Sequence, residues 1–179
     1  RSLPISRLAL EYLILTASRT KEVLEANWNE IDEAKNLWVL PAERTKTGFD
    51  HRVPLAGRTK EILSQAKLLS MGSELIFESP TTGRALSYNT LLHLLQKRIG
   101  SVATVHGFRS SFKDWASETT NFPNEVSEMA LSHKITSSVE AAYRRGDLLE
   151  KRRELMADWE EFLRNPDPKI VSLDFRARG

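Results

Sequence analysis

Hydrophobic residues recur at helical spacing through most of the chain. In the segment LPISRLALEYLILTASRT, Leu8, Tyr12 and Leu15 are separated by three or four residues, so they would share one face of a helix. Ser87 has the side chain of a helix cap, and Gly72 is a typical stop signal for the helix before it. The pattern predicts helices over residues 4–16, 20–26, 57–70, 87–98, 107–119, 123–131, 136–144 and 147–164.

Three short extended runs interrupt the helical pattern. Residues 28–31, 37–41 and 51–55 have strand character, and the connecting sequences DEAKN and ERTKTGFD are typical of hairpins. Beyond Asn165 the sequence PDPKIVSLDFRARG has two prolines and no helical period, which indicates a tail. We therefore predict an α+β fold. It would be a mostly α-helical single domain over residues 1–164 with a small three-stranded antiparallel sheet, followed by a tail over 165–179.

Length and composition limit the classes of protein. The chain has 179 residues, of which 40% are hydrophobic, enough for the core of one domain. It contains no cysteine, which excludes disulfides, thiolate metal sites and cysteine nucleophiles and favours a reducing compartment, the cytoplasm. No run approaches about 18 consecutive apolar residues, so we expect neither a membrane span nor a membrane partner. Because the first residue is Arg1, we expect a piece of a longer chain.

Net charge alone does not indicate a nucleic-acid ligand. The formal charge is only +2, so the bulk field of the protein is weak. Basic residues nevertheless gather in short clusters along the chain, and folding can bring such clusters to one face. Solvated helices of mixed charge would give the same pattern, so the charges leave both interpretations open.

The segment VHGFRSSF, residues 105–112, carries the first candidate chemistry. In a helix that advances about 100° per residue, its polar and aromatic residues fall on opposite sides. His106 and Arg109 then lie one turn apart, a spacing that suits a tetrahedral oxyanion such as phosphate. In the structural alternative, His106 caps the helix and Arg109 pairs with a carboxylate. The polar side would hold His106, Arg109, Ser110 and Lys113, and the aromatic side Phe108, Phe112 and Trp115.

Four more residues are candidates, and each has an ordinary structural alternative. Arg19 lies between two predicted helices, where its side chain can reach a site or form a surface ion pair. Lys46 lies at a predicted hairpin tip, where its ammonium can reach a leaving oxygen or remain solvated. His133, in LSHK, can act chemically or interact with a helix dipole. Tyr143, in VEAAYRRGD, has small neighbours and adjacent cations that favour a phenolate; a half-buried core tyrosine is the alternative.

Taken together, these candidates resemble the catalytic set of the tyrosine recombinases, the phage-integrase family. The segments HGFRSSF, LSHK and AAYRRGDLLEKRRELMADWEEFL are similar to those of integrases carried by prophages and genomic islands. The resemblance covers about residues 5–164. One departure is TASRTKEV, because the family more often has glycine near this arginine. In chain order the matching residues are Arg19, Lys46, His106, Arg109, His133 and Tyr143.

The resemblance implies strand cleavage that needs no metal, ATP or other cofactor. A phosphodiester repels nucleophiles, and its transition state places more charge on the nonbridging oxygens, which Arg19 and Arg109 would stabilise. By similarity to the family, Tyr143 would join the 3′ phosphate and release a 5′ hydroxyl, with Lys46 supplying the proton. The two histidines would act as hydrogen-bond donor and base, and either assignment stays open.

The family also implies double-stranded DNA attachment sites as substrate, a tetramer on DNA, a monomer without it, and DNA-bending accessory proteins. The amino-terminal DNA-binding domains of the family are expected to lie outside this sequence. Two other functions would use the same features, a type IB topoisomerase that relaxes supercoils and a noncatalytic DNA-binding remnant. The basic residues that we expect to contact DNA are Arg44, Lys46, Arg52, Arg144 and Arg145.

Overall fold

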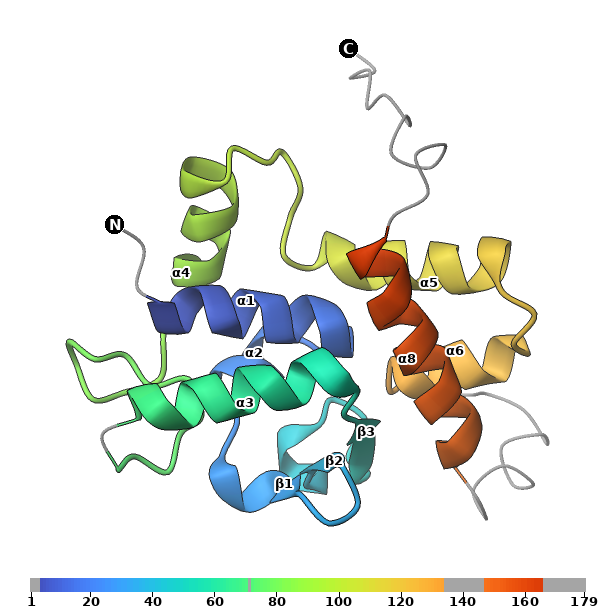
Figure 1. Ribbon diagram of the computed structural model, residues 1–179, viewed down its shortest axis with the longest axis horizontal. Coiled ribbons are helices and arrows are strands. Elements are labelled where there is room, and N and C mark those ends of the chain that lie inside the picture. The colour runs from blue at the N-terminus through green and yellow to red at the C-terminus, as the bar shows by residue number, and fades with distance from the viewer. Residues whose placement is uncertain (1–3, 71, 134–146, 166–179) are drawn as a thin grey trace.

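The computed structural model describes residues 4–70, 72–133 and 147–165. This part of the chain is mostly helical and carries a small antiparallel sheet, so the predicted fold class is confirmed (Figure 1). The predicted helix over 136–144 and nearly all of the predicted tail lie outside the described residues. None of the described helices is long and apolar enough to cross a membrane. The helices are α1 (Pro4–Thr16), α2 (Thr20–Leu24), α3 (Gly57–Leu69), α4 (Tyr88–His93), α5 (Gly107–Thr119), α6 (Asn124–Ala130) and α8 (Leu149–Arg164), and the strands are β1 (Ile31–Asp32), β2 (Leu37–Leu40) and β3 (His51–Pro54).

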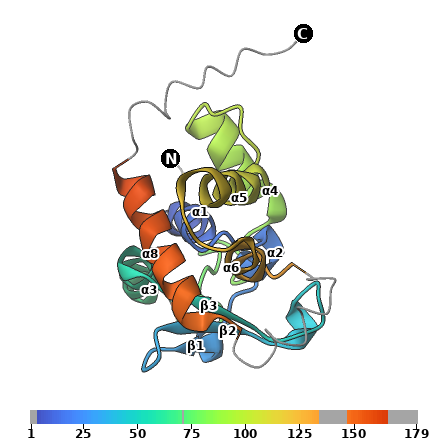
Figure 2. The same cartoon turned by 90° about the vertical axis from the view of Figure 1, so that its right-hand side faces the viewer.

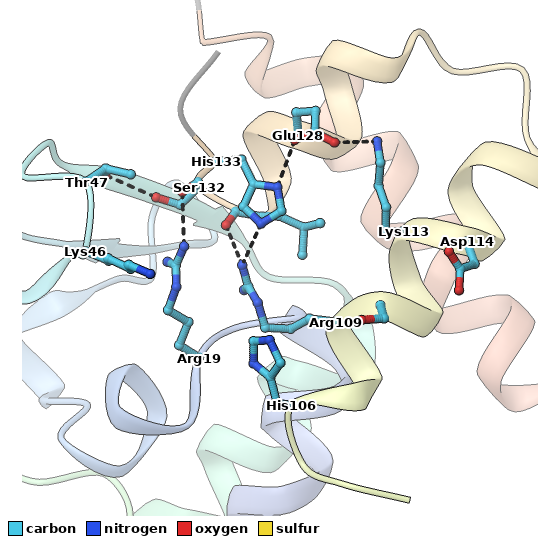
Figure 3. A pocket seen from close by; sticks show the side chains of 12 residues that line it. Arg19, Lys46, Thr47, His106, Arg109, Lys113, Asp114, Glu128, Ser132 and His133 are labelled. Atoms are coloured by element: carbon cyan, nitrogen blue, oxygen red, sulfur yellow. Dashed lines mark hydrogen bonds and ion pairs between the residues drawn. The ribbon is translucent and has the colours of Figure 1, made fainter. Parts of the chain in front are cut away.

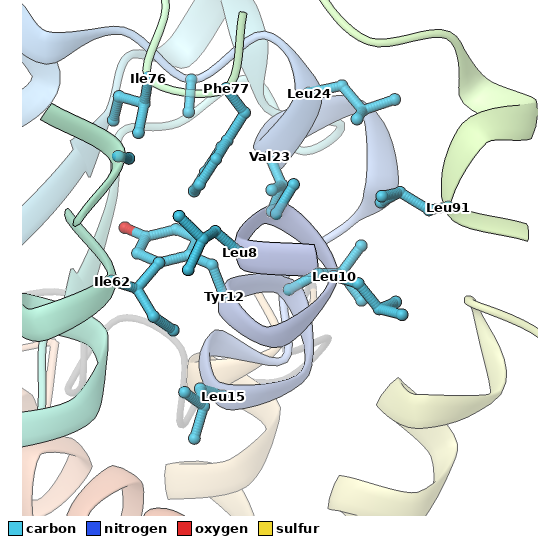
Figure 4. Close-up of a cluster of buried hydrophobic side chains, with 14 of the residues drawn as sticks. Leu8, Leu10, Tyr12, Leu15, Val23, Leu24, Ile62, Ile76, Phe77 and Leu91 are labelled. Carbon is cyan, nitrogen blue, oxygen red and sulfur yellow. The ribbon is translucent and has the colours of Figure 1, made fainter. Parts of the chain in front are cut away.

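Helix α1 is the centre of the first hydrophobic core. It contacts α2, α3, α4 and α8, and Figure 2 shows it enclosed among its neighbours. Leu8, Tyr12 and Leu15 are all buried, as their spacing predicts. The ring of Tyr12 packs against Trp38, with ring centroids 5.4 Å apart. It also packs against Phe77, with ring centroids 5.3 Å apart (Figure 4). A helix that is apolar nearly all round belongs inside a protein, and the rest of this core is built on α1.

The sheet has the order β1-β2-β3, with both pairs antiparallel. Leu37 lies opposite Pro54, and Leu40 lies opposite His51, so β2 and β3 form a short hairpin. The buried residues of β2 belong mainly to the first core. The connection between β2 and β3 carries Lys46, as the hairpin pattern predicts.

The first predicted strand, residues 28–31, is wrong over most of its length. Trp28–Glu30 forms a 3-10 turn, and β1 begins only at Ile31. The cause is the buried carboxylate of Glu30, which accepts hydrogen bonds from the backbone N–H of Asn27 (3.2 Å) and from the indole Nε1 of Trp38 (2.9 Å). These bonds stabilise a turn where the apolar pattern alone indicates a strand.

Two predicted helices end two or more residues before their predicted last residue. Helix α2 ends at Leu24 rather than at residue 26, because the backbone of Ala26 turns away to accept a hydrogen bond from the N–H of Ile76 (2.8 Å). The predicted helix over 87–98 is α-helical only as far as His93 and continues as a π-helical turn over Leu94–Arg98. The first difference is caused by a backbone contact with Ile76, and the second is a change in the backbone hydrogen-bond pattern. The spacing of apolar side chains predicts neither of them.

A second hydrophobic core joins α5, α6 and α8. Phe112, Trp115, Trp159 and Phe162 form an aromatic cluster, with the rings of Trp115 and Trp159 centred 5.0 Å apart. The indole Nε1 of Trp159 donates to the carbonyl of Ile14 in α1 (2.9 Å). Ile14 packs against both cores, so the second core is fixed to the end of the helix that organises the first.

The start of α8 is held to the sheet by a buried arginine. Arg152 is only 1% exposed, and its guanidinium donates to the carboxylate of Asp147 (2.6 Å) and to the backbone carbonyl of Arg52 in β3 (2.7 Å). Asp147 also accepts a hydrogen bond from the side chain of Arg52 (2.8 Å). The cluster therefore fixes Asp147, the first described residue before α8, against β3.

Removing this guanidinium should cost much stability. We expect Arg152→Met to lower the free energy of unfolding by about 3 kcal/mol, because it leaves Asp147 without its buried partner. The control is Lys151→Met on the exposed side of the same helix, with an effect within about 0.5 kcal/mol. Urea denaturation followed by circular dichroism measures both, and equal effects of the two substitutions would contradict the structural role of Arg152.

His51 in β3 lies among cationic side chains. The pKa of His51 is lowered to about 3, mainly by burial of its ring and also by the charges of Arg152, Arg19 and Arg109, while a hydrogen bond with the backbone of Ala130 partly opposes the shift. The imidazole is therefore neutral in the folded protein near neutral pH. Its protonation would place a positive charge beside three guanidinium groups.

This low pKa makes stability depend on pH. Between the unfolded pKa near 6.5 and the folded pKa near 3, the unfolded chain binds a proton at His51 that the folded chain does not. The contribution of His51 to stability is therefore complete above the unfolded pKa and is lost as the pH falls, by at most about 1.4 kcal/mol per pH unit. We expect His51→Gln to flatten the fall in unfolding free energy between about pH 6.5 and pH 5. Substituting the exposed His93 by Gln is the control, and an unchanged pH profile in His51→Gln would refute the assignment.

Candidate active site

Arg109 on α5 is buried and donates to the carbonyl ends of two helices. Its guanidinium contacts the carbonyl oxygens of Ala17, just after α1 (2.5 Å), and of Leu131, just after α6 (2.7 Å). The last carbonyls of a helix lack partners within the helix and carry the negative end of its dipole, so a cation there is well placed. Arg109 thus joins the two helix ends, rather than pairing with a carboxylate as the structural alternative required.

Two non-glycine residues in the left-handed conformation shape the loops around Arg109. Ala17 has a φ of 49° and Ser132 a φ of 51°. Such a φ strains a residue that has a Cβ atom, and glycine is the usual occupant of these positions. The departure of TASRTKEV from the family pattern is thus a local one. Ala17 adopts the left-handed conformation that glycine would adopt with less strain. Arg19, two residues later, still reaches the pocket.

Arg19 is held at the start of α2 by the buried Glu22. Its Nη1 donates to the Glu22 carboxylate (2.8 Å), which also accepts the backbone N–H of Arg19 (2.8 Å). The other end of the guanidinium donates to the carbonyl of Ser132 (3.2 Å). Because Glu22 is only 4% exposed, this is a fixed pair in the wall of the pocket rather than an ordinary surface ion pair.

His133 follows the end of α6 and has a partner on each side of its ring. Its Nδ1 lies 2.8 Å from the carboxylate of Glu128, and its Nε2 lies 3.4 Å from the guanidinium of Arg109 (Figure 3). The other oxygen of Glu128 pairs with Nζ of Lys113 on α5 (2.7 Å). The ring is therefore oriented by side chains from both α5 and α6.

His106 and Lys46 approach the same space from different sides (Figure 3). His106 occupies the position before α5, but its side chain makes no capping hydrogen bond. Thr104 does the capping instead, because its Oγ1 and its carbonyl both accept the backbone N–H of Gly107 (3.0 Å). The exposed side chain of Lys46 extends from the connection between β2 and β3. Both side chains are thus available to a bound ligand.

The charges of the two arginines act on each other. The pKa of Arg109 is lowered to about 10, mainly by burial and also by the positive charge of Arg19, while the negative charge of Glu22 opposes the shift. Arg109 stays charged at neutral pH, but beside another cation, and an anion bound between them would relieve the repulsion. Within residues 4–70, 72–133 and 147–165, no three histidine or acidic side chains gather as a metal site would need. The paired guanidinium groups of Arg19 and Arg109 are the feature of this pocket that suits an anion.

The pocket has a volume of about 830 Å³ and collects most of the candidate residues. The polar side of the VHGFRSSF helix faces it as the helical spacing predicts, while Phe112 and Trp115 are buried on the opposite side. Arg19 and Lys46 come from the half of the chain that forms the first core, and the other candidates come from the second half. The lining residues are Arg19, Lys46, Thr47, His106, Arg109, Ser110, Lys113, Asp114, Glu128, Leu131, Ser132 and His133.

The remaining candidates lie elsewhere or outside the described part. Tyr143, Arg144 and Arg145 fall within residues 134–146, which the structure does not describe. The side chain of Arg44 is 17% exposed and donates to Glu30 and to the carbonyl of Glu22 (2.8 Å), so its contacts are internal. Arg52 pairs with Asp147, as described above. DNA contact by these four arginines stays a prediction, and for Arg44 it would require breaking a structural ion pair.

Sequence reasoning did not assign a role to Glu128. It lies five residues before His133, at a spacing that matches neither a helical face nor a known metal pattern. The two residues meet because α6 ends at Ala130 and Ser132 turns the chain back. The sequence does contain a signal for this pair. Where a helix is expected to end just before a candidate histidine, an acidic residue in the last two turns of that helix can reach the histidine, as Glu128 does.

The chain is similar in sequence and in fold to known proteins. The sequence profile of the phage integrase family matches residues 4–148. The prophage integrase IntA of Escherichia coli (strain K12) is 36% identical over 170 residues, covering 94% of this chain and 41% of that protein. The solved lambda integrase catalytic core is 25% identical with a TM-score of 0.55, covering 73% of this chain and 84% of that one.

The match to longer proteins is partial. A lambda integrase dimer bound to a COC′ core site is 25% identical with a TM-score of 0.57, covering 81% of this chain and 44% of that one. The chain spans about two fifths of the length of the curated relatives it matches. The family profile, however, matches well over half of this chain and includes every candidate residue. The chain belongs to the phage integrase family.

Proposed function

We propose that this chain is the catalytic domain of a site-specific DNA recombinase that cuts and rejoins strands through a 3′-phosphotyrosyl intermediate. The observation that carries the proposal is the convergence of Arg19, Lys46, His106, Arg109 and His133 on one pocket. We assign the catalytic domain to residues 1–164 and a tail to 165–179. Family membership supports this function, since the relatives are integrases of phages and prophages.

The pocket suits the charge that develops when a phosphodiester is attacked. Its two guanidinium groups can each donate paired hydrogen bonds to nonbridging oxygens, and they are held by fixed partners, so little reorganisation is needed. The mutual repulsion of Arg19 and Arg109 falls most when the bound anion carries most charge, which is at the transition state. This differential stabilisation is what accelerates a reaction.

Tyr143 is the nucleophile in this proposal. The chain has three tyrosines. Tyr12 is fully buried in the first core, where burial raises its pKa well above the usual value, and Tyr88 lies on α4 and does not line the pocket. In the sequence, Tyr143 follows His133, which lines the pocket, by ten residues and precedes Asp147, which is fixed to β3, by four. These exclusions support Tyr143 as the nucleophile.

The proposed cleavage uses only groups of the protein and the DNA, and it needs no external cofactor. The phenolic oxygen of Tyr143 attacks phosphorus while its proton passes to one of the pocket histidines, and the bond from phosphorus to the 5′ oxygen breaks. Lys46 gives its proton to that oxygen, which leaves as a hydroxyl. In the reverse reaction, a 5′ hydroxyl of another strand attacks the phosphorus of the phosphotyrosine, the new phosphodiester forms, and the phenolic oxygen of Tyr143 leaves. The energy of the ester is kept in the enzyme-bound bond, so no ATP is consumed.

We infer that the substrate is double-stranded DNA carrying attachment sites and that several protomers assemble on it. Lambda integrase has been solved as a dimer bound to a core site, which supports the inference by analogy. We expect a tetramer on DNA, a monomer without it, DNA-bending accessory proteins, and a cytoplasmic location. DNA contacts by Arg44, Arg52, Arg144 and Arg145 are part of the same proposal. Family membership favours recombination over type IB topoisomerase activity. A noncatalytic DNA-binding remnant would form no covalent adduct with DNA.

The nucleophile can be tested by trapping. A pool of nicked duplexes of randomised sequence, which lose a short fragment after cleavage, should accumulate a covalent adduct with the wild-type chain. Tyr143→Phe should form none, while its DNA affinity stays within about twofold, because only the attacking oxygen is removed. Denaturing gels measure the adduct, and sequencing the trapped DNA defines the substrate. No adduct with the wild-type chain would contradict catalysis, and an adduct with Tyr143→Phe would contradict the assignment of Tyr143.

The role of Lys46 can be tested by changing the leaving group. We expect Lys46→Ala to slow cleavage of the trapped sequence by about 10²- to 10⁴-fold, the usual contribution of a general acid. A substrate with sulfur at the 5′ bridging position should restore most of the rate, because a thiolate leaves without a proton. Arg109→Lys provides the control, since its defect lies in charge stabilisation and sulfur should not rescue it. Equal defects with both leaving groups would exclude Lys46 as the acid.

A further inference from the structure

The connection between β2 and β3, which carries Lys46, is closed on itself at its base. The carboxylate of Asp50 accepts the backbone N–H of Ala42 (2.9 Å), and the hydroxyl of Thr45 donates to the carbonyl of Phe49 (2.8 Å). The N–H of Thr45 also donates to the carbonyl of Ala42 (3.2 Å). Lys46 therefore extends from a closed loop, and its place at the pocket depends on how this loop is attached to the rest of the protein.

Arg44 attaches the loop to α2 and to the turn before β1. It is the last residue of the 3-10 turn Ala42–Arg44, and its side chain is mostly buried. One end of the guanidinium pairs with the carboxylate of Glu30, and Nη2 donates to the backbone carbonyl of Glu22 (2.8 Å). Lys46 is two residues further along the chain, so the contacts of Arg44 limit where Lys46 can lie.

Glu30 is a firm partner because its own surroundings hold it. Its buried carboxylate accepts hydrogen bonds from the indole Nε1 of Trp38 (2.9 Å) and from the backbone N–H of Asn27 (3.2 Å). A buried carboxylate is costly without a compensating cation, and Arg44 supplies that cation. The pair therefore fixes the base of the loop against an immobile part of the first core.

Glu22 contacts both Arg44 and Arg19. Its carboxylate accepts the guanidinium of Arg19 (2.8 Å), and its backbone carbonyl accepts that of Arg44 (2.8 Å). This carbonyl is open to Arg44 because the N–H of Ala26, four residues later, donates instead to the carbonyl of Val23 (3.1 Å). The loop and the guanidinium of Arg19 are thus attached to one residue, which limits changes in their separation.

The tip of the loop is attached more weakly than its base. The hydroxyl of Thr47 lies 3.4 Å from the hydroxyl of Ser132, on the other side of the pocket (Figure 3). A hydrogen bond of this length between two neutral groups is weak, whereas Arg44 forms charge-assisted bonds at the base. The position of Lys46 is therefore set chiefly through Arg44.

We propose that Arg44 is a positioning residue for Lys46. Its two contacts hold the base of the loop, and so keep the ammonium of Lys46 within reach of the leaving 5′ oxygen while Arg19 binds the same phosphate. The proposal rests on the proposed function, and it deepens that function by naming the group on which proton transfer from Lys46 depends. In the described part of the chain Arg44 does not line the pocket, so it acts on the reaction through Lys46.

The proposal predicts a defect that depends on the leaving group. Single-turnover cleavage of the trapped sequence is measured at saturating enzyme, so that DNA affinity does not enter the rate constant. We expect Arg44→Met to slow the substrate with the normal 5′ oxygen by about 10- to 100-fold, because a displacement of about 1 Å can cost that much. Sulfur at the 5′ bridging position should restore most of the rate, since a thiolate leaves without a proton from Lys46. Equal defects with both leaving groups would overturn the proposal.

A double substitution tests the same dependence in another way. If Arg44 acts through Lys46, Arg44→Met should slow a Lys46→Ala chain by less than about twofold. A double variant whose defect is the product of the two single defects would contradict this. Glu43→Ala is the control, because Glu43 is an exposed neighbour in the same 3-10 turn and does not line the pocket. It should leave the rate unchanged with either leaving group, and a defect as large as that of Arg44→Met would refute the specific role of Arg44.

A second variant guards against loss of the fold. Arg44→Met leaves the buried Glu30 without its cation, so it can lower stability. Arg44→Lys keeps a cation beside Glu30, but an ammonium lacks the planar fork that reaches Glu30 and Glu22 together. We expect Arg44→Lys to stay folded, to lose less of the rate than Arg44→Met, and to show the same rescue by sulfur. Thermal unfolding followed by circular dichroism checks each variant. Full activity of Arg44→Lys, or a defect that sulfur does not relieve, would sink the proposal.

The attachment of the loop can be measured without DNA. We expect amide hydrogen exchange over residues 42–50 to be about tenfold faster in Arg44→Met and in Arg44→Lys than in the wild type, because the base of the loop opens more often. The increase should exceed any change in α1, and Glu43→Ala should show none. Mass spectrometry of peptides from the 179-residue chain measures the exchange. Unchanged exchange over residues 42–50 in both variants of Arg44 would show that Arg44 does not hold the loop.

These measurements separate the proposal from the function on which it rests. A wild-type chain that forms no covalent adduct contradicts the recombinase function, yet the exchange over residues 42–50 still tests whether Arg44 holds the loop. A wild-type chain that forms the adduct, combined with equal defects of Arg44→Met on oxygen and sulfur substrates, contradicts only the role of Arg44.

Discussion

The structure depends on one buried cation that holds the carbonyl ends of two helices. Arg109 donates to Ala17 after α1 and to Leu131 after α6, and these two helices belong to different hydrophobic cores. The free carbonyls at a helix end need partners, and a guanidinium can serve two such ends at once because its donors diverge in a plane. The same side chain that would bind phosphate thus also satisfies the backbone around it. The guanidinium of Arg109 therefore serves both the stability of the fold and the proposed binding of phosphate.

The left-handed residues beside these carbonyls show how the arrangement is maintained. Ala17 and Ser132 adopt a conformation that a side chain disfavours, and each directs a carbonyl toward an arginine. Strain of this kind persists only where surrounding contacts fix the backbone. Here the contacts are the guanidinium groups themselves, so the loops and the cations support each other.

Much of the fold could be predicted from the sequence because its signals are local. The apolar spacing of α1 and the two-sided character of α5 depend on residues within a few turns, and both match the structure. The fate of Arg44, the turn at Glu30 and the pairing of Glu128 with His133 depend on side chains that meet only after folding. The order of the motifs along the chain indicated which residues should come together in the pocket. The residues that orient these side chains, such as Glu22 and Glu128, became evident only in the tertiary structure. The anchoring of α8 by Arg152 has the same origin, since a basic residue in an amphipathic helix ordinarily indicates solvent exposure.

The pocket lies along the boundary between the two cores, and neither core contains it alone. Arg19 and Lys46 come with the first, while Arg109 and His133 come with the second. A small rotation of one half against the other would leave both interiors well packed and yet separate the two guanidinium groups. Displacement of a reacting group by about 1 Å can reduce a rate by about a hundredfold. For the proposed reaction, correct folding of the two cores is therefore not sufficient, because their relative position must also be kept. Ile14, which packs against both cores, contributes to that relative position.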